Sequence, residues 1–176
     1  MERKTPLYQT HVDAGGKIVE FGGFLMPVQY PTGVLAEHMA VRQKAGLFDV
    51  SHMGELRLKG PDAVANVQKL ITADISTMQD GDIKYAMFCN DAGGIIDDFI
   101  VYRCVADDYW LVVNAGNRDK DAAWVESHLF GDVDYRDEGD DWGQVALQGP
   151  TSGDILKKLC AEQYIPAKYY TFIDNV

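Results

Sequence analysis

The stretch from Lys84 to Ala115 constrains the fold more than any other part of the chain. It contains three strand-like runs, Lys84–Asn90, Ile95–Arg103 and Tyr109–Asn114. Short segments rich in Asp, Ala and Gly separate the runs. Turns of this composition between apolar runs are typical of β-hairpins. The stretch therefore predicts a three-stranded antiparallel meander.

The middle run of this meander carries two adjacent acids, Asp97 and Asp98, among apolar neighbours. Because strand side chains alternate between the two faces of a sheet, these carboxylates point in opposite directions. A charged carboxylate in a dry site costs several kcal/mol unless it is paired. The strand does not need such residues for its own stability, so the acids require another explanation.

The turn near Ala106 sets the register between the second and third runs. It places Asp98 opposite Asn114 and Tyr102 opposite Trp110, and residues in opposite positions share a face. One face would then carry Asp98, Ile100, Tyr102, Val112 and Asn114. A mostly apolar wall with one carboxylate and one amide suits a pocket for a flat polar heterocycle. The alternatives are a solvated acid at a sheet edge and an Asp that caps a turn.

The formal net charge of −11 over 176 residues limits the classes of partner. Contacts to nucleic-acid phosphates or acidic membranes need an excess of Lys and Arg. We therefore expect neither nucleic acid nor membrane as a partner. The length suits one large domain or two small ones with a substantial core.

The cysteines Cys89, Cys104 and Cys160 are far apart and form no CxxC pair. This spacing fits neither a disulfide framework nor a zinc site, and the acidic loop 137–141 lacks the ligand order of an EF-hand. The first residues contain no apolar secretory segment, and no run is long enough to span a membrane. We expect a cytoplasmic protein that uses no metal.

Apolar periodicity and turn residues divide the rest of the chain into strands and helices. Further strands are expected near residues 18–23, 56–58, 133–136, 143–148 and 167–176. Helices are expected at residues 34–45, 61–72, 118–130 and 150–160. Helices between groups of strands predict an α+β fold with antiparallel sheets flanked by helices.

Five polar residues outside the meander invite a catalytic interpretation. His38 and His128 lie at helical spacing with apolar residues, and we expect both to be packed structural histidines. Asp49, Ser51 and His52 lie within four residues of extended chain, so their side chains point to opposite faces. No sharp turn exposes the serine as a nucleophile. A hydrolase is therefore disfavoured.

Several motifs occur in order along the chain: Met26–Tyr30, Gly46–Glu55, Gly93–Asp98 and Leu147–Pro150. They resemble motifs of the glycine cleavage system T protein, an aminomethyltransferase. The sequences FDVSHMGE and GGIIDD are the most specific of them, and the resemblance covers essentially the whole chain. It implies the folate-binding aminomethyltransferase fold.

The resemblance implies tetrahydrofolate as the acceptor and the aminomethyl-lipoyl arm of H protein as the donor. The products would be methylenetetrahydrofolate, ammonia and reduced lipoyl, with no metal. Two alternatives are a related folate-dependent demethylase and a folate-binding regulatory or assembly protein without transfer activity. These relatives match the FDVSHMGE stretch less closely.

The resemblance also implies a set of site residues. The essential second acid of the family's Asp-Asp pair corresponds to Asp98. The family's pterin contacts correspond to Met53, Tyr85, Ile100, Tyr102, Val112, Asn114 and Tyr169. Four of these seven residues belong to the wall that the strand register places beside Asp98.

Members of this family are longer than 176 residues, and their second half supplies a glutamate and an arginine to the folate site. The chain therefore resembles an N-terminal portion, which we expect to bind folate weakly and to turn over little. The resemblance also implies a discontinuous first domain, residues 1–52 with 140–176. Residues 53–139 would form an inserted domain that carries the catalytic strand.

Overall fold

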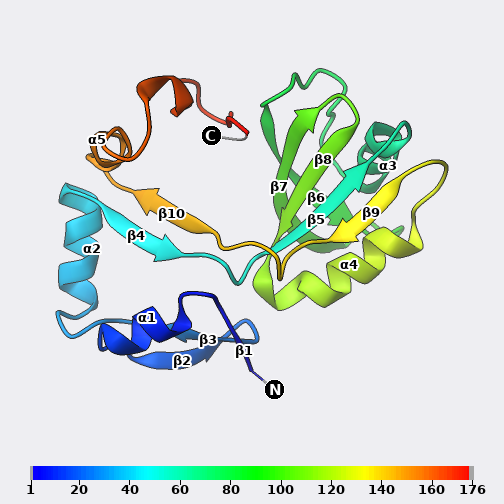
Figure 1. Cartoon of the computed structure of the whole chain (residues 1–176). Coiled ribbons are helices and arrows are strands. Elements are labelled where there is room, and N and C mark those ends of the chain that lie inside the picture. The colour runs from blue at the N-terminus through cyan, green and yellow to red at the C-terminus, as the bar shows by residue number, and fades with distance from the viewer. Residues whose placement is uncertain (1, 175–176) are drawn as a thin grey trace. The chain divides into compact units, whose positions relative to one another are not determined.

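The computed structural model describes residues 2–174, which form two compact units (Figure 1). The first unit comprises residues 2–52 and 142–165, and the second comprises residues 53–141 and 166–174. The sequence-based division assigned residues 166–176 to the first module instead. The structure joins the described part of that segment to the second unit, because Ile83 N–H donates a hydrogen bond to the Tyr170 carbonyl.

The first unit contains two small sheets and three α-helices. The three-stranded sheet has the order β1 (Arg3–Lys4), β3 (Phe24–Pro27), β2 (Ile18–Phe21), and the two-stranded sheet pairs β4 (Gly46–Asp49) with β10 (Val145–Gln148). The helices are α1 (Tyr8–Asp13), α2 (Val34–Gln43) and α5 (Ser152–Leu156), followed by a 3-10 turn, η2 (Glu162–Tyr164). Strands β2 and β3 form a tight hairpin, because Gly22 and Gly23 adopt the positive φ angles of 57° and 86° that such a turn requires.

The second unit is built around a five-stranded sheet of order β6-β7-β8-β5-β9, in which every neighbouring pair is antiparallel. Its strands are β5 (Gly54–Lys59), β6 (Ile83–Cys89), β7 (Ile95–Val105), β8 (Asp108–Val113) and β9 (Asp134–Asp137). The predicted meander is confirmed as β6-β7-β8. Tyr102 lies opposite Trp110, as the turn near Ala106 predicts.

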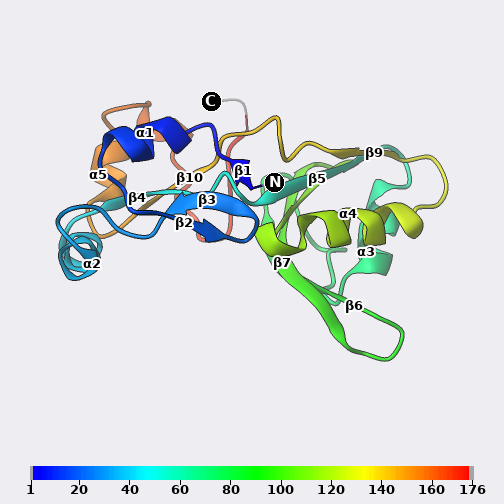
Figure 2. The ribbon, with the colours of Figure 1, turned by 90° about the horizontal axis from the view of Figure 1, so that it is seen from below.

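Two helices, α3 (Ala63–Leu70) and α4 (Arg118–Ser127), pack on one face of this sheet; the 3-10 turn η1 (Ala115–Asn117) precedes α4 (Figure 2). The core of the unit lies between the helices and that face. Its buried side chains include Leu58, Val67, Phe88, Val101, Leu111 and Val125. We call the opposite face of the sheet the outer face. The α+β class with antiparallel sheets and flanking helices is thus confirmed.

Two of the predicted elements differ from the structure at the C-terminal end. Helix α5 spans only Ser152–Leu156 rather than residues 150–160. The strand predicted over residues 167–176 is wrong for residues 167–174, which form a single bridge between Thr171 and Asp82. Tyr170 has a φ of 56°, which is incompatible with an extended strand. Residues 175 and 176 lie outside the described part of the chain.

Of the two histidines predicted to be packed and structural, only one fits that prediction. His128 is half-buried, and its Nδ1 lies 2.7 Å from the Trp124 carbonyl oxygen, as a structural histidine should. His38 is exposed, so its assignment to a packed core is wrong. Helix α2 buries none of its residues, because in this chain its apolar side borders an open hollow rather than a packed layer.

Candidate functional site

Most of the residues predicted to contact folate lie together on the outer face of the five-stranded sheet. Ile100 of β7 lies opposite Tyr85 of β6 on one side and Val112 of β8 on the other. Tyr102 follows two residues later on the same face and is half-buried. We call the set of Tyr85, Asp98, Ile100, Tyr102 and Val112 the Asp98 wall.

Asp98 presents an exposed carboxylate at one end of this wall. Its register partner on β6 is Met87, so Tyr85 lies two residues away on the same face. The Tyr85 hydroxyl donates a hydrogen bond to Asp98 Oδ2. That hydrogen bond raises the pKa of the Tyr85 phenol, which therefore remains a donor. A carboxylate with one fixed donor and open access can accept a further proton or a positive charge.

Asp97 points to the opposite face and is only 5% exposed. Its carboxylate accepts hydrogen bonds from Asn114 N–H at 3.2 Å, Asn114 Nδ2 at 3.0 Å and Asn117 Nδ2 at 2.7 Å. Burial alone would raise the pKa of Asp97. The interaction with the Asp121 carboxyl and the hydrogen bonds from Asn114 and Asn117 outweigh that effect and hold the pKa of Asp97 below its usual range.

The predicted position of the Asn114 amide needs a correction. The register of β7 with β8 begins at Ile100 and Val112, and Asn114 follows two residues beyond that pair. Its amide donates to the Asp98 backbone rather than to the Asp98 carboxylate. Asn114 Nδ2 donates to the Asp98 backbone carbonyl at 2.7 Å and to the buried carboxylate of Asp97. Asn114 follows the last residue of β8, where the chain turns into η1, so its side chain no longer follows the strand alternation. The buried network around Asp97 gives a reason to expect that Asp97→Asn lowers the stability of the unit.

Two further predicted contacts, Met53 and Tyr169, are not part of this wall. Met53 is half-buried and immediately precedes β5. Tyr169 is 85% exposed, and its ring contacts Tyr170 at a centroid distance of 4.6 Å. Phe172 instead packs edge-on against Tyr102 at 5.2 Å. The C-terminal segment thus reaches the wall through Phe172, which the sequence argument did not select.

Glu55 extends the wall on its other side and was missed by sequence reasoning. It lies opposite Val112, is 6% exposed, and has a pKa raised to about 7 by burial and by nearby acids, against the opposing charge of Arg118. The sequence did contain a signal for Glu55. Because Leu56 and Leu58 point into the core, the alternate residues of the same strand lie on the outer face. The missing information was that β5 pairs with β8.

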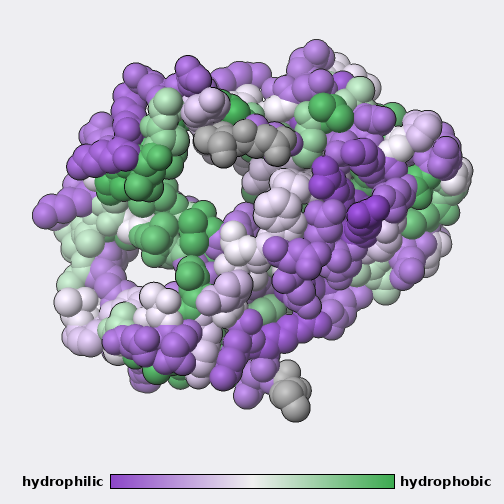
Figure 3. All heavy atoms as spheres, in the orientation of Figure 1, coloured by the Kyte–Doolittle hydropathy of each residue, from purple (hydrophilic) through white to green (hydrophobic). Residues whose placement is uncertain are grey.

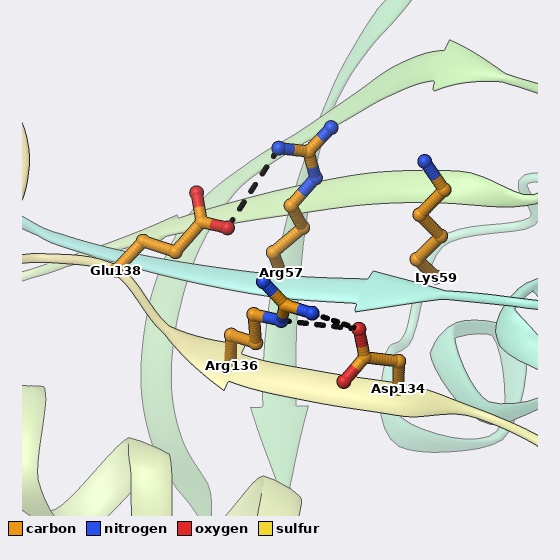
Figure 4. A pocket seen from close by; sticks show the side chains of 5 residues that line it. All are labelled: Arg57, Lys59, Asp134, Arg136 and Glu138. Carbon is orange, nitrogen blue, oxygen red and sulfur yellow. Dashed lines mark hydrogen bonds and ion pairs between the residues drawn. The ribbon is translucent and has the colours of Figure 1, made fainter.

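Farther along the outer face, a charged hollow of about 140 Å³ lies beside β9 (Figure 4). Its lining residues are Arg57, Lys59, Asp134, Arg136 and Glu138. The figure shows the Arg57 and Arg136 side chains turned toward Glu138 and Asp134, and each of the three cations has an acidic partner. The hollow is smaller than typical ligand pockets, which begin at about 300 Å³. It is therefore a network of paired charges rather than a folate site.

The ion pair between Asp108 and Arg57 in this network allows a test of what stabilises the second unit. Asp108 is 4% exposed, and its two carboxylate oxygens accept from Arg57 at 2.8 and 2.7 Å. Asp108→Asn is expected to lower the free energy of unfolding by about 1–3 kcal/mol at pH 7, as for a charge-assisted bond in a partly exposed pair. The matched control is Asp107→Asn, which changes an exposed acid in the same turn and should have little effect.

The pH dependence of this effect follows from the pKa of Asp108, which its hydrogen bonds with Arg57 hold below the usual range. The stabilisation is present above the unfolded-state pKa of about 4 and is lost as the pH falls through the folded-state value. Urea unfolding of wild type and Asp108→Asn should therefore converge in acid. A difference that stays constant down to pH 2 would contradict this account.

A larger hollow, of about 540 Å³, lies in the first unit between α2, β3 and β4. Mostly apolar side chains line it, with His11, Tyr30 and Asp49 at one side. His11 lies 2.7 Å from the Tyr30 hydroxyl and 2.8 Å from Asp49 Oδ2. Ser51 instead donates to the Gln144 carbonyl and is buried, so Asp49, Ser51 and His52 form no nucleophile triad.

Neither a metal-binding cluster nor a membrane-spanning helix is found within residues 2–174. No group of three His, Cys, Asp or Glu side chains in this part of the chain is placed to hold a metal ion. Within the same described residues, every helix is too short or too polar to cross a membrane.

Comparison with known proteins gives a single family. A profile described as the GCVT N-terminal domain matches residues 7–175. Curated proteins named aminomethyltransferase are similar along nearly the whole chain. One from Desulfitobacterium hafniense is 49% identical and one from Staphylococcus haemolyticus is 47% identical, over 97% and 99% of this chain.

A solved structure gives the same result for the fold. The crystal structure of glycine cleavage system aminomethyltransferase T from Bartonella henselae superposes with a TM-score of 0.83 at 37% identity. The match covers 90% of this chain and 44% of that protein. The two curated relatives are covered to 47% and 48%, so the chain spans about half the length of the proteins it matches.

Proposed function

The chain belongs to the GCVT N-terminal domain family of aminomethyltransferases, and from this premise we propose that the Asp98 wall binds tetrahydrofolate for aminomethyl transfer. The donor is the aminomethyl group on the lipoyl arm of H protein, and the setting is the cytoplasm. The aminomethyl carbon passes to the folate, the amine leaves as ammonia, and the sulfur returns as reduced lipoyl. No step requires a metal.

The observation that carries this proposal is the exposed Asp98 carboxylate at the end of a largely apolar face. Half-buried Ile100 and Tyr102 offer flat apolar surface for a pterin ring, and Tyr85 fixes one oxygen of the carboxylate. A preoriented carboxylate stabilises the cation that develops at the transferred carbon. It also orients the attacking folate nitrogen and relays its proton.

Two other functions are compatible with the same fold but would not transfer an aminomethyl group. A folate-dependent demethylase would use another one-carbon donor, and a regulatory or assembly protein would bind folate without transfer. Identities of 47% and 49% to curated aminomethyltransferases favour transfer over both.

The test uses a chain restored to the length of its relatives. We define the length-restored chimera as residues 1–176 followed by the C-terminal half of the Desulfitobacterium hafniense aminomethyltransferase. Mixed with aminomethyl-loaded H protein and tetrahydrofolate, it should release ammonia and form methylenetetrahydrofolate. Folate binding without ammonia release would support the regulatory alternative, and activity only with methylated amines would support the demethylase.

Tyr85→Phe tests how much the phenol contributes to this site. The substitution removes the only donor that Tyr85 offers to Asp98 and leaves the ring in place, which is 49% exposed. We expect kcat/KM of the length-restored chimera to fall roughly two- to tenfold, because a hydrogen bond exposed to water contributes only about 0.5–1.5 kcal/mol net. The unfolding midpoint should stay unchanged. A loss as large as that of Asp98→Asn would show that the phenol itself takes part in proton transfer.

A further inference from the structure

A pair of buried carboxyl groups lies on the helix-covered side of the strand that carries Asp98. Asp97 of β7 is 5% exposed and Asp121 of α4 is 0% exposed. The two carboxyls interact through their side chains, and each shifts the pKa of the other. The proposed transfer chemistry uses neither of them, because both point away from the outer face.

A hydrogen bond between these acids would require a proton on one of them, because an ionised carboxylate only accepts. The Asp97 carboxylate receives donors from Asn114 and Asn117, whereas the Asp121 oxygens receive no N–H or O–H donor from residues 2–174. Two ionised carboxylates in contact would repel each other in a buried site. A proton on Asp121 removes the repulsion and supplies the missing donor.

The electrostatics of the site agree with this placement of the proton. Burial, followed by the hydrogen bond to Asp97 and the charge of Asp97, raises the pKa of Asp121 to about 8. Lys120, the neighbouring residue on α4, opposes the shift. The charged groups that face Asp121 are thus one acid on β7 and one lysine on its own helix.

The pair connects directly to the backbone at Asp98. The Asn114 amide bridges the Asp97 carboxylate and the Asp98 carbonyl. On the other side of Asp97, Lys120 Nζ donates to the Ile96 carbonyl at 2.6 Å. The backbone on both sides of Asp97 is therefore held by residues that border the acid pair.

We propose that Asp97 and Asp121 share one proton and that this pair fixes the position of Asp98 on the outer face. Asp121 is a positioning residue, since it touches Asp97 and not the substrate. The positioning role rests on the proposed aminomethyl transfer. The shared proton does not, and it is measurable in the 176-residue chain alone.

The first test measures the unfolding equilibrium constant of wild type and Asp121→Asn between pH 4 and pH 9. Because the folded state keeps a proton that the unfolded state releases above about pH 4, the wild type should lose stability as the pH rises toward 8. The ratio of the wild-type unfolding constant to that of Asp121→Asn should rise by up to about tenfold per pH unit over that range. Asp119→Asn, in the same helix and exposed, should keep the wild-type slope. Equal slopes for wild type and Asp121→Asn would overturn the shared proton.

The second test measures transfer by the length-restored chimera. Asp121→Ala should lower kcat at least tenfold with little change in KM, through misplacement of Asp98. Asp121→Asn should restore most of that loss, because its amide still donates to Asp97. Equal kcat losses for the two variants would overturn the positioning role. The pH slope needs only Asp121→Asn, so it decides the shared proton even where Asp121→Ala does not fold. A chimera without any transfer would contradict the proposed function and leave that slope unaffected.

Discussion

Replacing Asp98 by Asn is expected to remove most of the transfer activity of the length-restored chimera while leaving its fold unchanged. Asn has nearly the same shape but no charge, so it cannot stabilise a cation or accept the proton of the folate nitrogen. Loss of one preoriented electrostatic group costs roughly 10²–10³ in kcat. Because Asp98 is exposed and its carboxylate accepts its hydrogen bond from Tyr85, which is itself on the surface, the unfolding midpoint should not move.

Steady-state ammonia release at saturating folate measures this effect. The control is Asp91→Asn, an exposed acid in the turn between β6 and β7. It has the same change of charge in the same hairpin and should keep full activity. Activity of Asp98→Asn within threefold of wild type, in a folded protein, would remove Asp98 from the chemistry.

The second large effect concerns folate affinity. The 176-residue chain should bind tetrahydrofolate roughly 10²–10⁴ times more weakly than the length-restored chimera. A pterin site needs enclosure and convergent polar groups, and the Asp98 wall supplies only one side. The glutamate and arginine implied by the family resemblance belong to the half that the chimera adds. Two charge-assisted hydrogen bonds at about 1.5–3 kcal/mol each account for a loss of this size.

Calorimetric titration of both proteins with tetrahydrofolate measures the ratio. Asp98→Asn in each background serves as a control that separates the contribution of the wall from that of the added half. If the 176-residue chain binds within threefold of the chimera, the affinity resides in the first half and this account of the site is wrong.

The meander was predictable because its information is local. The turn at Asp91–Gly94 closes through Asn90, whose side-chain oxygen accepts from Ala92 N–H and Gly94 N–H, and Gly93 takes a φ of 80°. A local turn of this kind fixes the register of the strands that flank it. The pairing of Tyr102 with Trp110 followed from the next turn in the same way.

What escaped prediction depends on contacts between distant parts of the chain. The pairing of β5 with β8 and β9, which brings Glu55 beside Val112, has no local signal. The direction of the Asn114 amide depends on where Asp97 and α4 lie, and sequence alternation does not specify it.

Burial was predicted least well in the first unit. Leu47 is 66% exposed, Phe48 43% and Val145 52%, although all three are apolar residues of the strands β4 and β10. Figure 3 shows hydrophobic surface, in green, over this part of the first unit. Periodicity shows which side of an element is apolar, not whether another layer covers it. The prediction for His38 failed for this reason.

Amide chemical-shift mapping shows whether tetrahydrofolate binds on the outer face of the five-stranded sheet. Tetrahydrofolate is titrated to millimolar concentration into the isotope-labelled 176-residue chain, so that weak binding suffices. We expect the shifted amides to cluster at the Asp98 wall, which comprises Tyr85, Asp98, Ile100, Tyr102 and Val112. Shifts confined to the hollow around Val41 and Phe48 in the first unit, with the Asp98 wall unmoved, would contradict this expectation.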